Sequence, residues 1–304
     1  MNRREFLKAV AVAGGTLFAG GMGLTRCSRS QPSTKKQGFS FAFITDLHLR
    51  PGMREERLRR CIDMINEKSC DFVVTGGDLV EDALGVGYDA AKGQYDLVES
   101  VLVDLKVPVY HTIGNHELFG VYVESGVSPE HAEYGKEMYR QRIGAGRTYY
   151  SFDYGDWHFV SLDSMKIEGR KFVGGVDEAQ MNWLRNDFAT VGQKRPVCLV
   201  THIPMVSSWV QLRHGITVAP SPEGFIVNNK ELYQAFEPYN LKLVLQGHLH
   251  VLEDWSFNGT RFIGAGAVSG GWGTGPLDGP GPSFGIVTIV GEDVAYEHVR
   301  IPLG

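Results

Sequence analysis

Five short apolar runs, each followed by Asp, Asn or His, limit this chain to folds in which buried strands end at a common edge. The runs cover residues 39–45, 72–75, 107–113, 197–200 and 241–245. Continuous apolar runs of this length predict strands buried on both faces. The motifs that end them are Asp46-Leu47-His48, Gly76-Gly77-Asp78, Gly114-Asn115-His116-Glu117, Thr201-His202 and Gly247-His248-Leu249-His250. We therefore expect an α/β fold whose site lies at the carboxyl ends of its strands.

The side chains at these strand ends are carboxylates, imidazoles and one amide, with no thiolate among them. The seven candidate metal ligands are Asp46, His48, Asp78, Asn115, His202, His248 and His250. Seven groups are too many for one four-coordinate ion, but they suit two ions. Two ions roughly 3.5–4 Å apart share a carboxylate, activate a bridging water or hydroxide, and hold both oxygens of an in-line phosphoryl displacement. The set therefore predicts a dinuclear centre that hydrolyses a phosphate ester.

Together the motifs resemble the pattern of the calcineurin-like metallophosphoesterase superfamily, which reads D-x-H, G-D, G-N-H-[DE], a lone His and G-H-x-H. All five blocks occur in this order, and the resemblance extends from about residue 39 to residue 301. It implies a four-layer α/β sandwich of two mixed β-sheets flanked by helices, as in metallo-dependent phosphatases. Apolar periodicity places the helices at residues 55–67, 94–105, 129–142, 177–190 and 229–237.

The resemblance also distributes the ligands between the two metals. It implies that Asp46, His48 and His250 hold the first ion, that Asn115, His202 and His248 hold the second, and that Asp78 bridges both. His116 matches the family's non-ligand histidine, which contacts the scissile phosphate and protonates the leaving oxygen. Glu81 matches the position that supplies an orienting carboxylate for that histidine in some members, and Asp82 and Glu117 are rivals for this role. An acid of this kind needs a pKa near the working pH.

The sequence does not assign this chain to one branch of the superfamily. The D-x-H opening and the G-H-x-H ending resemble the bacterial cyclic-nucleotide phosphodiesterases. Purple acid phosphatases form a second branch, but no tyrosine follows Asp78 where they place an iron-ligating one, which disfavours their Fe(III) site. Three functions therefore stay possible. The first is hydrolysis of phosphomonoesters or phosphodiesters, the second is strict phosphodiesterase activity, and the third is that of a non-catalytic metal-binding scaffold. The metals are Mn, Fe, Zn or Co, because Asp, Asn and His suit several first-row ions.

The amino terminus has the layout of a twin-arginine export signal. Asn2-Arg3-Arg4-Glu5-Phe6-Leu7-Lys8 precedes an apolar run at residues 9–24 that is rich in Gly and Ala. We expect a signal region at residues 1–27, a linker at 28–38 and one phosphoesterase domain at 39–304. The chain would be a partner of the twin-arginine export machinery. Export of already folded proteins fits metal loading in the cytoplasm, followed by a periplasmic or cell-surface location.

Attachment to the membrane depends on how this region is processed. Leu24-Thr25-Arg26-Cys27 resembles a lipoprotein box, except that Arg26 stands where a small residue is expected. Three outcomes stay open: lipidation at Cys27, cleavage near residues 19–23, and retention as an uncleaved anchor. Among the later cysteines, Cys61, Cys70 and Cys198, buried free thiols are expected, with a Cys61–Cys70 bridge as the alternative.

Substrate choice is expected in loops that overhang the metals. The candidates are residues 81–94, 118–130 and 204–228, and the last loop carries Arg213 and His214 as predicted substrate contacts. The Gly-rich stretch 264–281, with Trp272, either borders the same pocket or is an irregular surface loop. The glycines before Asp78 and Asn115 are expected to let backbones approach closely at the metals.

Other features limit the function. A net charge of −5, with no basic stripe, disfavours nucleic acid and leaves a small phosphorylated substrate as the expected partner. The chain has no G-x-x-x-x-G-K-[ST] motif, so a nucleotide-cradling glycine loop is not expected. Three further histidines, His111, His131 and His158, lie in or beside apolar runs or a predicted helix, and are expected to be structural.

Overall fold

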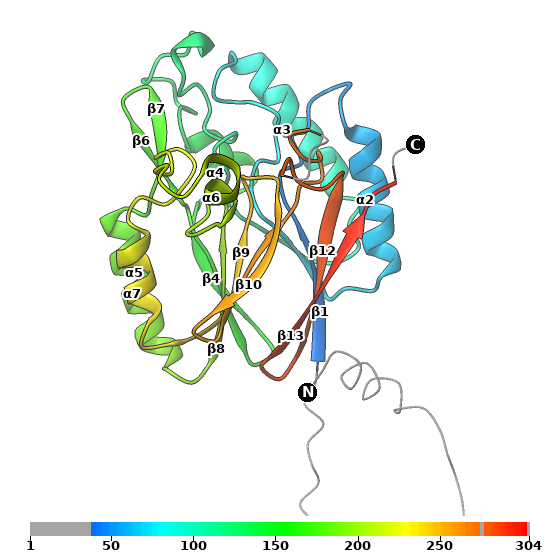
Figure 1. The fold of residues 1–304 in the computed structure, drawn as a ribbon. Coiled ribbons are helices and arrows are strands. Elements are labelled where there is room, and N and C mark those ends of the chain that lie inside the picture. The colour runs from blue at the N-terminus through cyan, green and yellow to red at the C-terminus, as the bar shows by residue number, and fades with distance from the viewer. Residues whose placement is uncertain (1–37, 274–276, 303–304) are drawn as a thin grey trace, which may run out of the picture. The chain divides into compact units, whose positions relative to one another are not determined.

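Two β-sheets pack face to face in the computed structural model, which describes residues 38–273 and 277–302 (Figure 1). The predicted signal region, Cys27, and linker residues 28–37 lie outside the described residues. The first sheet has the order β13-β12-β1-β2-β3 and the second the order β10-β11-β9-β8-β5-β4. All described residues from Gly38 onward belong to one compact unit.

The first sheet joins three parallel strands to an antiparallel pair. Its strands are β1 (Gly38–Ile44), β2 (Phe72–Thr75), β3 (Val109–His111), β12 (Ser283–Val290) and β13 (Asp293–Arg300). β1, β2 and β3 run parallel, while β12 pairs antiparallel with β1 and β13. This sheet is therefore mixed, as expected for the predicted sandwich.

The second sheet is mixed in the same way. Its strands are β4 (Tyr150–Tyr154), β5 (Trp157–Ser161), β8 (Pro196–Thr201), β9 (Asn240–Gln246), β10 (Leu252–Phe257) and β11 (Thr260–Ala265). β5, β8, β9 and β11 are parallel to one another, and β4 and β10 are antiparallel at the two edges. A separate hairpin of β6 (Met165–Glu168) and β7 (Lys171–Gly174) completes the strands.

Alternation along β1 shows how one strand serves two cores. Phe41 and Phe43 point between the sheets, where they pack in an aromatic cluster with residues of the second sheet such as Phe159. Ala42 and Ile44 point the other way, into the core shared with the helices. Because successive side chains in a strand face opposite sides, the unbroken apolar run from Phe41 to Ile44 is buried on both faces of β1.

Helices cover the outer faces of both sheets. Figure 1 shows α2 (Glu55–Glu67) and α3 (Tyr88–Leu102) on one side and α5 (Glu178–Val191) and α7 (Asn229–Phe236) on the other. In α2 the buried residues Leu58, Cys61, Ile62 and Ile65 form one stripe at helical spacing. The four layers of the predicted α/β sandwich are confirmed, and the boundaries predicted for β2 and α2 match the structure residue for residue.

Several other predicted elements are wrong in extent. The helix predicted at residues 129–142 is confined to α4 (Glu137–Arg142), because Gly135 has a φ of 68° and its backbone pairs with Phe119 instead. The helix predicted at residues 94–105 starts earlier, at Tyr88, and ends at Leu102. The strand predicted at 107–113 shortens to Val109–His111, since Pro108 has no N–H for a ladder. The short helix α6 (Trp209–His214) was not predicted.

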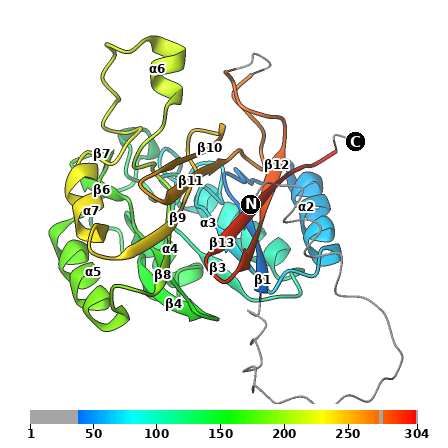
Figure 2. The same cartoon turned by 60° about the horizontal axis from the view of Figure 1, so that its bottom comes forward.

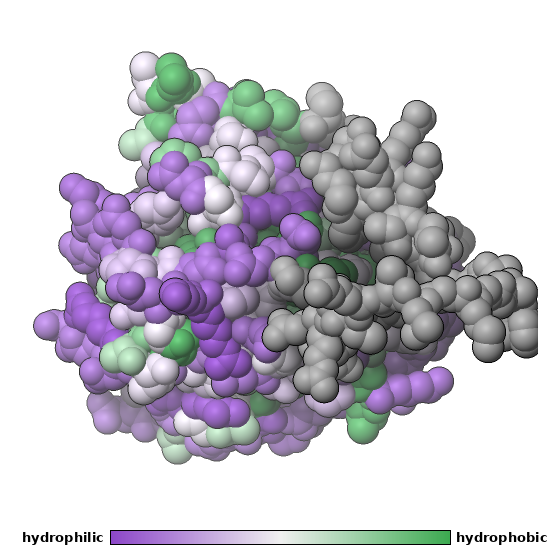
Figure 3. Space-filling view, turned by 90° about the horizontal axis from the view of Figure 1, so that it is seen from below, coloured by the Kyte–Doolittle hydropathy of each residue, from purple (hydrophilic) through white to green (hydrophobic). Residues whose placement is uncertain are grey.

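Two further observations concern cysteines and membranes. Cys61, Cys70 and Cys198 are free and buried, so the structure contains no Cys61–Cys70 bridge. Within residues 38–273 and 277–302, none of the helices combines the length and the apolar character that crossing a membrane requires. Figure 3 looks onto the end of the sheets where β1 begins. The coloured residues visible there are mostly hydrophilic.

Candidate metal centre

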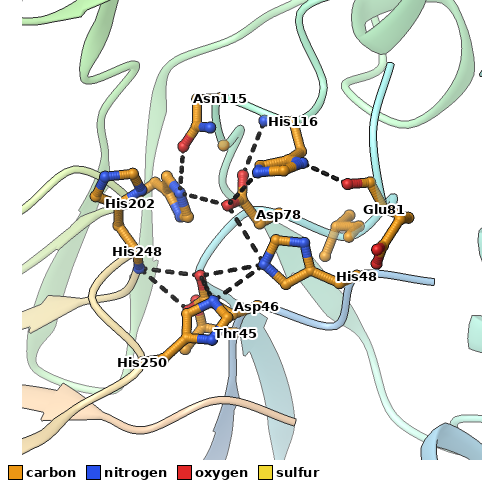
Figure 4. Close-up of polar contacts among 12 residues, drawn as sticks. Thr45, Asp46, His48, Asp78, Glu81, Asn115, His116, His202, His248 and His250 are labelled. Atoms are coloured by element: carbon orange, nitrogen blue, oxygen red, sulfur yellow. Dashed lines mark hydrogen bonds and ion pairs between the residues drawn. The ribbon is translucent and has the colours of Figure 1, made fainter. Parts of the chain in front are cut away.

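The five polar motifs meet at one edge, because each follows a strand that runs parallel to its neighbour. Asp46 and His48 follow β1, Asp78 follows β2, and Asn115 follows β3. From the second sheet, His202 follows β8, and His248 and His250 follow β9. Figure 4 shows these side chains pointing toward one another. The structure thus brings together all seven residues predicted as ligands, most of them buried.

One group of side chains clusters around the end of β1. Asp46, His48 and His250 offer ligand atoms that lie close enough to hold one ion. The Nε2 atoms of His48 and His250 are 3.0 Å apart, and Nε2 of His250 is 3.3 Å from Oδ1 of Asp46. These three residues are the predicted ligands of the first metal.

A second group forms where the two sheets meet. Asp78, His202 and His248 also offer converging ligand atoms, and Oδ1 of Asn115 lies 3.0 Å from Nε2 of His202. Oδ2 of Asp78 is 3.1 Å from Nε2 of His202 and 3.7 Å from Nε2 of His48. Asp78 therefore faces both groups, the place that a bridging carboxylate requires.

Glycines allow the loops to come this close. A Cβ on Gly114 would lie 2.2 Å from the backbone nitrogen of Asp78, and one on Gly77 would lie 2.6 Å from Nδ1 of His202. Any larger residue would push the loops after β2 and β3 apart. The sequence-based expectation for these glycines is confirmed.

The imidazole tautomers fit a cation between the side chains. Nδ1 of His202 donates to the carbonyl of Gly76 at 2.7 Å, and Nδ1 of His250 donates to that of Gly270 at 2.9 Å. When these two rings are neutral, the Nε2 atom of each is a hydrogen-bond acceptor. It faces carboxylate oxygens, which are also acceptors. Such converging acceptors need a cation or an extra proton among them. Backbone carbonyls that orient histidine ligands in this way are common around protein-bound metals.

The pKa values of these groups show the same unmet demand for positive charge. Burial opposes a charge on His202, but attraction and a hydrogen bond from Asp78 raise its pKa to about 9. Burial likewise disfavours the ionised form of Asp78, yet the surrounding histidines, with His202 foremost, hold its pKa well below the usual value. For His48 and His248, burial lowers the pKa to about 4 and about 3, so both stay neutral and able to bind a metal.

Backbone strain is concentrated in the same residues. Of the nine described residues other than glycine with positive φ, five are candidate ligands: Asp46 (54°), His48 (46°), Asp78 (51°), His248 (69°) and His250 (56°). A left-handed conformation is unfavourable for residues with a Cβ and persists only where the surroundings enforce it. The residues at the strand ends thus adopt an unfavourable backbone conformation, and this conformation turns their side chains inward.

Glu117 is a residue of this centre whose role was not predicted. Its buried carboxylate accepts hydrogen bonds from the backbone N–H groups of Asp78, Leu79, Val80 and Gly114, at 2.6–3.2 Å. Burial, and then repulsion from Asp78, raise its pKa to about 7. It ties the loop that carries Asp78 to the loop that carries Asn115. Sequence reasoning considered it only as a rival partner for His116.

His116 lies beside the cluster and is partly open to solvent. Its backbone N–H donates to Oδ1 of Asp78 at 2.9 Å, and its Nε2 is 3.8 Å from Oδ2 of the same carboxylate. Burial lowers its pKa, but Asp78, Glu117 and the Glu81 carbonyl outweigh burial and raise it. The ring is therefore held where it can carry a proton toward a substrate at the metals.

The expected role of Glu81 needs correction. The backbone carbonyl of Glu81, and not its carboxylate, accepts from Nδ1 of His116. The carboxylate pairs with Arg54, whose guanidinium also donates to the carbonyl of His48 at 2.7 Å. Of the two rivals, Asp82 caps the N–H of Gly85 at 3.0 Å. No carboxylate side chain among these three orients the His116 ring by a hydrogen bond.

The predicted substrate contacts Arg213 and His214 make their contacts elsewhere. Both lie on α6, where Arg213 pairs with Asp278 at 2.6 Å and both side chains pack against Trp209. Neither contacts any of the seven clustered residues in the interactions found. By contrast Trp272, from the Gly-rich loop, stacks on His250.

The histidines expected to be structural contact groups outside the cluster. His111 contacts Oγ1 of Thr75, and His131 accepts from the N–H of Glu133. His158 lies between two carboxylates, those of Asp153 and Asp187.

Comparisons with known proteins agree with this arrangement. A family model described as calcineurin-like phosphoesterase matches residues 39–252. A dimetal phosphatase from Danio rerio has a TM-score of 0.58 at 16% identity, covering 87% of this chain and 99% of that one. A comparison with curated proteins finds no match.

Two further solved structures share the fold. GAP50, the anchor in the inner membrane complex of Plasmodium, has a TM-score of 0.56 at 14% identity, over 88% of this chain and 86% of that one. Purple acid phosphatase PPD1 from yellow lupin seeds has a TM-score of 0.54 at 16% identity, over 87% of this chain and 52% of that one. At such identities the likeness shows the fold alone, so function must be argued from the site.

Proposed function

Because this chain belongs to the calcineurin-like phosphoesterase family, and so is a metal-dependent phosphoester hydrolase, we propose that it is an exported enzyme that uses two metal ions to hydrolyse phosphomonoesters or phosphodiesters. The observation that carries the two-metal proposal is that Asp78 lies near both ligand groups: its Oδ2 is 3.1 Å from Nε2 of His202 in one group and 3.7 Å from Nε2 of His48 in the other. A single group would suit one ion, whereas this arrangement places a carboxylate between two.

The chain's own residues divide the work. Asp46, His48 and His250 would hold one ion, and Asn115, His202 and His248 the other, with Asp78 shared. When bound, the ions would polarise a phosphoryl oxygen and lower the pKa of the attacking water. Glu117 fixes the spacing of the loops that carry Asp78 and Asn115, so the ligands are positioned before substrate arrives.

His116 supplies the proton for the leaving oxygen in this proposal. Its Nδ1 is engaged by the carbonyl of Glu81, which leaves Nε2 as the atom that carries the mobile proton. Burial lowers the pKa of His116, but attraction from Asp78 and then Glu117 outweighs burial and raises it, which favours the protonated form. Departure of an alkoxide without such a proton is slow, and a positioned acid typically contributes about 10²–10⁴-fold.

The non-catalytic rival, a scaffold that binds metal without turnover, has less support. A scaffold that only binds metal has no need for a proton donor, whereas His116 lies beside the ligands with its Nε2 3.8 Å from Oδ2 of Asp78. Strict phosphodiesterase activity stays the alternative reaction, because nothing in the metal ligands distinguishes a monoester from a diester.

One experiment separates these functions. Full-length protein, reconstituted in turn with Mn, Fe, Zn or Co, is assayed on p-nitrophenyl phosphate and on its bis-p-nitrophenyl diester. Asp78→Ala should lose activity with every metal. Asp104→Ala is the matched control, because Asp104 pairs with Arg59 at the surface, away from the cluster. Equal, near-zero rates for wild type and Asp78→Ala would overturn the enzyme proposal, and hydrolysis of the diester alone would favour the phosphodiesterase.

Export rests on the sequence alone and is tested separately. Arg3→Lys with Arg4→Lys should keep the protein in the cytoplasm, whereas wild type reaches the periplasm or cell surface. Cys27→Ala distinguishes lipidation from cleavage, since only a lipidated protein would leave the membrane fraction on that substitution. Cytoplasmic retention of the wild type would contradict the location.

A further inference from the structure

The described part of the loop between β11 and β12, residues 266–273 and 277–282, presents an aromatic ring beside the candidate metal centre. The indole of Trp272 lies parallel to the imidazole of His250, with centroids 4.1 Å apart and planes inclined by 14°. Its Nε1 donates to the carbonyl of Leu249 at 2.7 Å, and its backbone N–H donates to the carbonyl of Asp278 at 2.7 Å. Stacking and two hydrogen bonds therefore fix the position of this side chain.

The loop is braced on both sides. A Cβ on Gly279 would lie 2.0 Å from the carbonyl oxygen of His250, so the loop packs directly on the backbone of this candidate ligand. On the other side, Nε1 of Trp209 donates to the carbonyl of Leu277 at 2.6 Å, and Arg213 pairs with Asp278. Figure 2 shows α6 and this loop extending in the same direction from the sheets. The segment from α6 accordingly supports the loop that carries Trp272.

Trp272 is nevertheless 59% exposed. Because His250 covers one face of the indole, the exposed area belongs mainly to the opposite face and the edge. A large aromatic surface left open to water costs free energy that burial would recover, and its usual use is to pack against a ligand ring. Its centroid is 4.1 Å from that of His250, a proposed metal ligand, which puts the indole within reach of the leaving group of a phosphate ester held at the metals.

We infer that Trp272 is a specificity-determining residue, and that the open face of its indole stacks on a flat aromatic ring in the leaving group of the substrate. The substrate class is then an aryl or nucleoside phosphate ester and not an aliphatic one. This inference rests on the proposed function and adds a substrate class to it. Trp272 also supports His250, and a purely supporting role is the alternative that the experiment must exclude.

The experiment compares esters with and without a ring. The metal-reconstituted full chain is assayed on phenyl phosphate, adenosine 5′-monophosphate and glycerol 3-phosphate. Trp272→Leu should lower kcat/KM for an ester with a ring, relative to glycerol 3-phosphate, by about fivefold to tenfold, the worth of one aromatic contact. Trp272→Phe should keep part of the preference. Differences in intrinsic reactivity cancel, because each ester is compared between wild type and variant.

Trp183→Leu is the matched control. Trp183 is a partly buried tryptophan on α5 that contacts Tyr149 and none of the clustered residues, so its loss should leave the ratio unchanged. Loss on phenyl phosphate alone would identify aryl esters, and loss on adenosine 5′-monophosphate alone would identify nucleotides. An equal loss on all three esters would show that Trp272 only supports His250, and would overturn the inference.

A binding measurement keeps the inference apart from the proposed function. Calorimetric titration with phenylphosphonate and methylphosphonate, which are not hydrolysed, should show a preference for the phenyl compound that Trp272→Leu reduces by a similar factor. If wild type hydrolyses no ester but retains this preference, the proposed function fails and the ring-binding role stands. If the preference is absent from the wild type, Trp272 does not bind a ring and the inference fails.

Discussion

Two clusters in this molecule pair buried histidines with carboxylates, and they differ in what faces the imidazole nitrogens. His158 on β5 donates from both nitrogens, to Asp153 at 2.7 Å and to Asp187 at 2.8 Å. His202 donates to a backbone carbonyl from Nδ1 and turns Nε2 toward Asp78 and Asn115. The first ring is complete as an imidazolium ion. The second ring has its Nε2 among acceptors only, so this nitrogen needs either a proton or a metal ion, and residue type and burial alone do not identify a metal site.

The largest expected effect comes from replacing the histidine of each cluster by glutamine. His202→Gln should lower phosphoesterase activity by more than about hundredfold, because a ligand side chain is lost where even supporting residues cost 10–100-fold. His158→Gln should leave activity unchanged and lower the melting temperature. Steady-state assays and thermal unfolding of both variants check this. Comparable activity losses in the two variants would remove the distinction between the clusters.

Glu117→Gln should come next in size. The amide offers one oxygen where the carboxylate offers two, and each carboxylate oxygen accepts from two N–H groups, so two of the four N–H groups lose their acceptor. We expect metal affinity or activity to fall by about 10–100-fold, as for other residues that orient ligands. Glu133→Gln, at a carboxylate that pairs with Arg142, is the control. Unchanged metal affinity in Glu117→Gln would show that the loops are positioned without it.

The pH dependence of metal binding should be a smaller effect with a defined sign. His202 has a pKa of about 9 in the metal-free protein, so at pH 7 an ion must displace its proton. Affinity for the second ion should rise as pH increases toward 9, by about tenfold per unit for one proton released. Asp46 and Asp78 have lowered pKa values and stay ionised over this range. Calorimetry in buffers of different ionisation enthalpy counts the protons. Affinity independent of pH between 6 and 9 would contradict this assignment.

The smallest predicted effect lies in the other cluster. Burial lowers the pKa of His158, but its hydrogen bonds to Asp187 and Asp153 outweigh burial and raise it. Its charged form therefore stabilises the fold fully below the unfolded pKa of about 6.5, and this stability is lost as pH rises through the folded pKa. We expect His158→Gln to cost about 2 kcal/mol near pH 6 and less above the folded pKa. Denaturant unfolding of both proteins at several pH values measures this, and a constant difference would refute it.

Much of the fold was predictable because local pattern and tertiary structure agree. The apolar runs before Asp46, Asp78, His202 and His248 are strands, and α2 has a clear apolar stripe. The helix predicted at residues 129–142 failed because tertiary pairing of Gly135 with Phe119 overrode local propensity. The hairpin β6–β7 and helix α6 are too short for their periodicity to be distinctive.

The site was predictable only in part, for a physical reason. Polar side chains at strand ends recur as motifs, so the clustering of the seven candidate ligands could be predicted from the sequence. Contacts made by backbone atoms leave no trace in side-chain type. The Glu81 carbonyl beside His116 and the four N–H groups on Glu117 are of this kind. The stacking of Trp272 on His250 joins residues from different loops, and only the folded chain shows it.

Anomalous diffraction from crystals of the manganese-loaded protein would show directly whether two ions bind at the strand ends. We expect two peaks, one beside Asp46, His48 and His250 and one beside Asn115, His202 and His248, with the Asp78 carboxylate between them. A single peak, or two peaks that do not share Asp78, would contradict the proposed dinuclear centre.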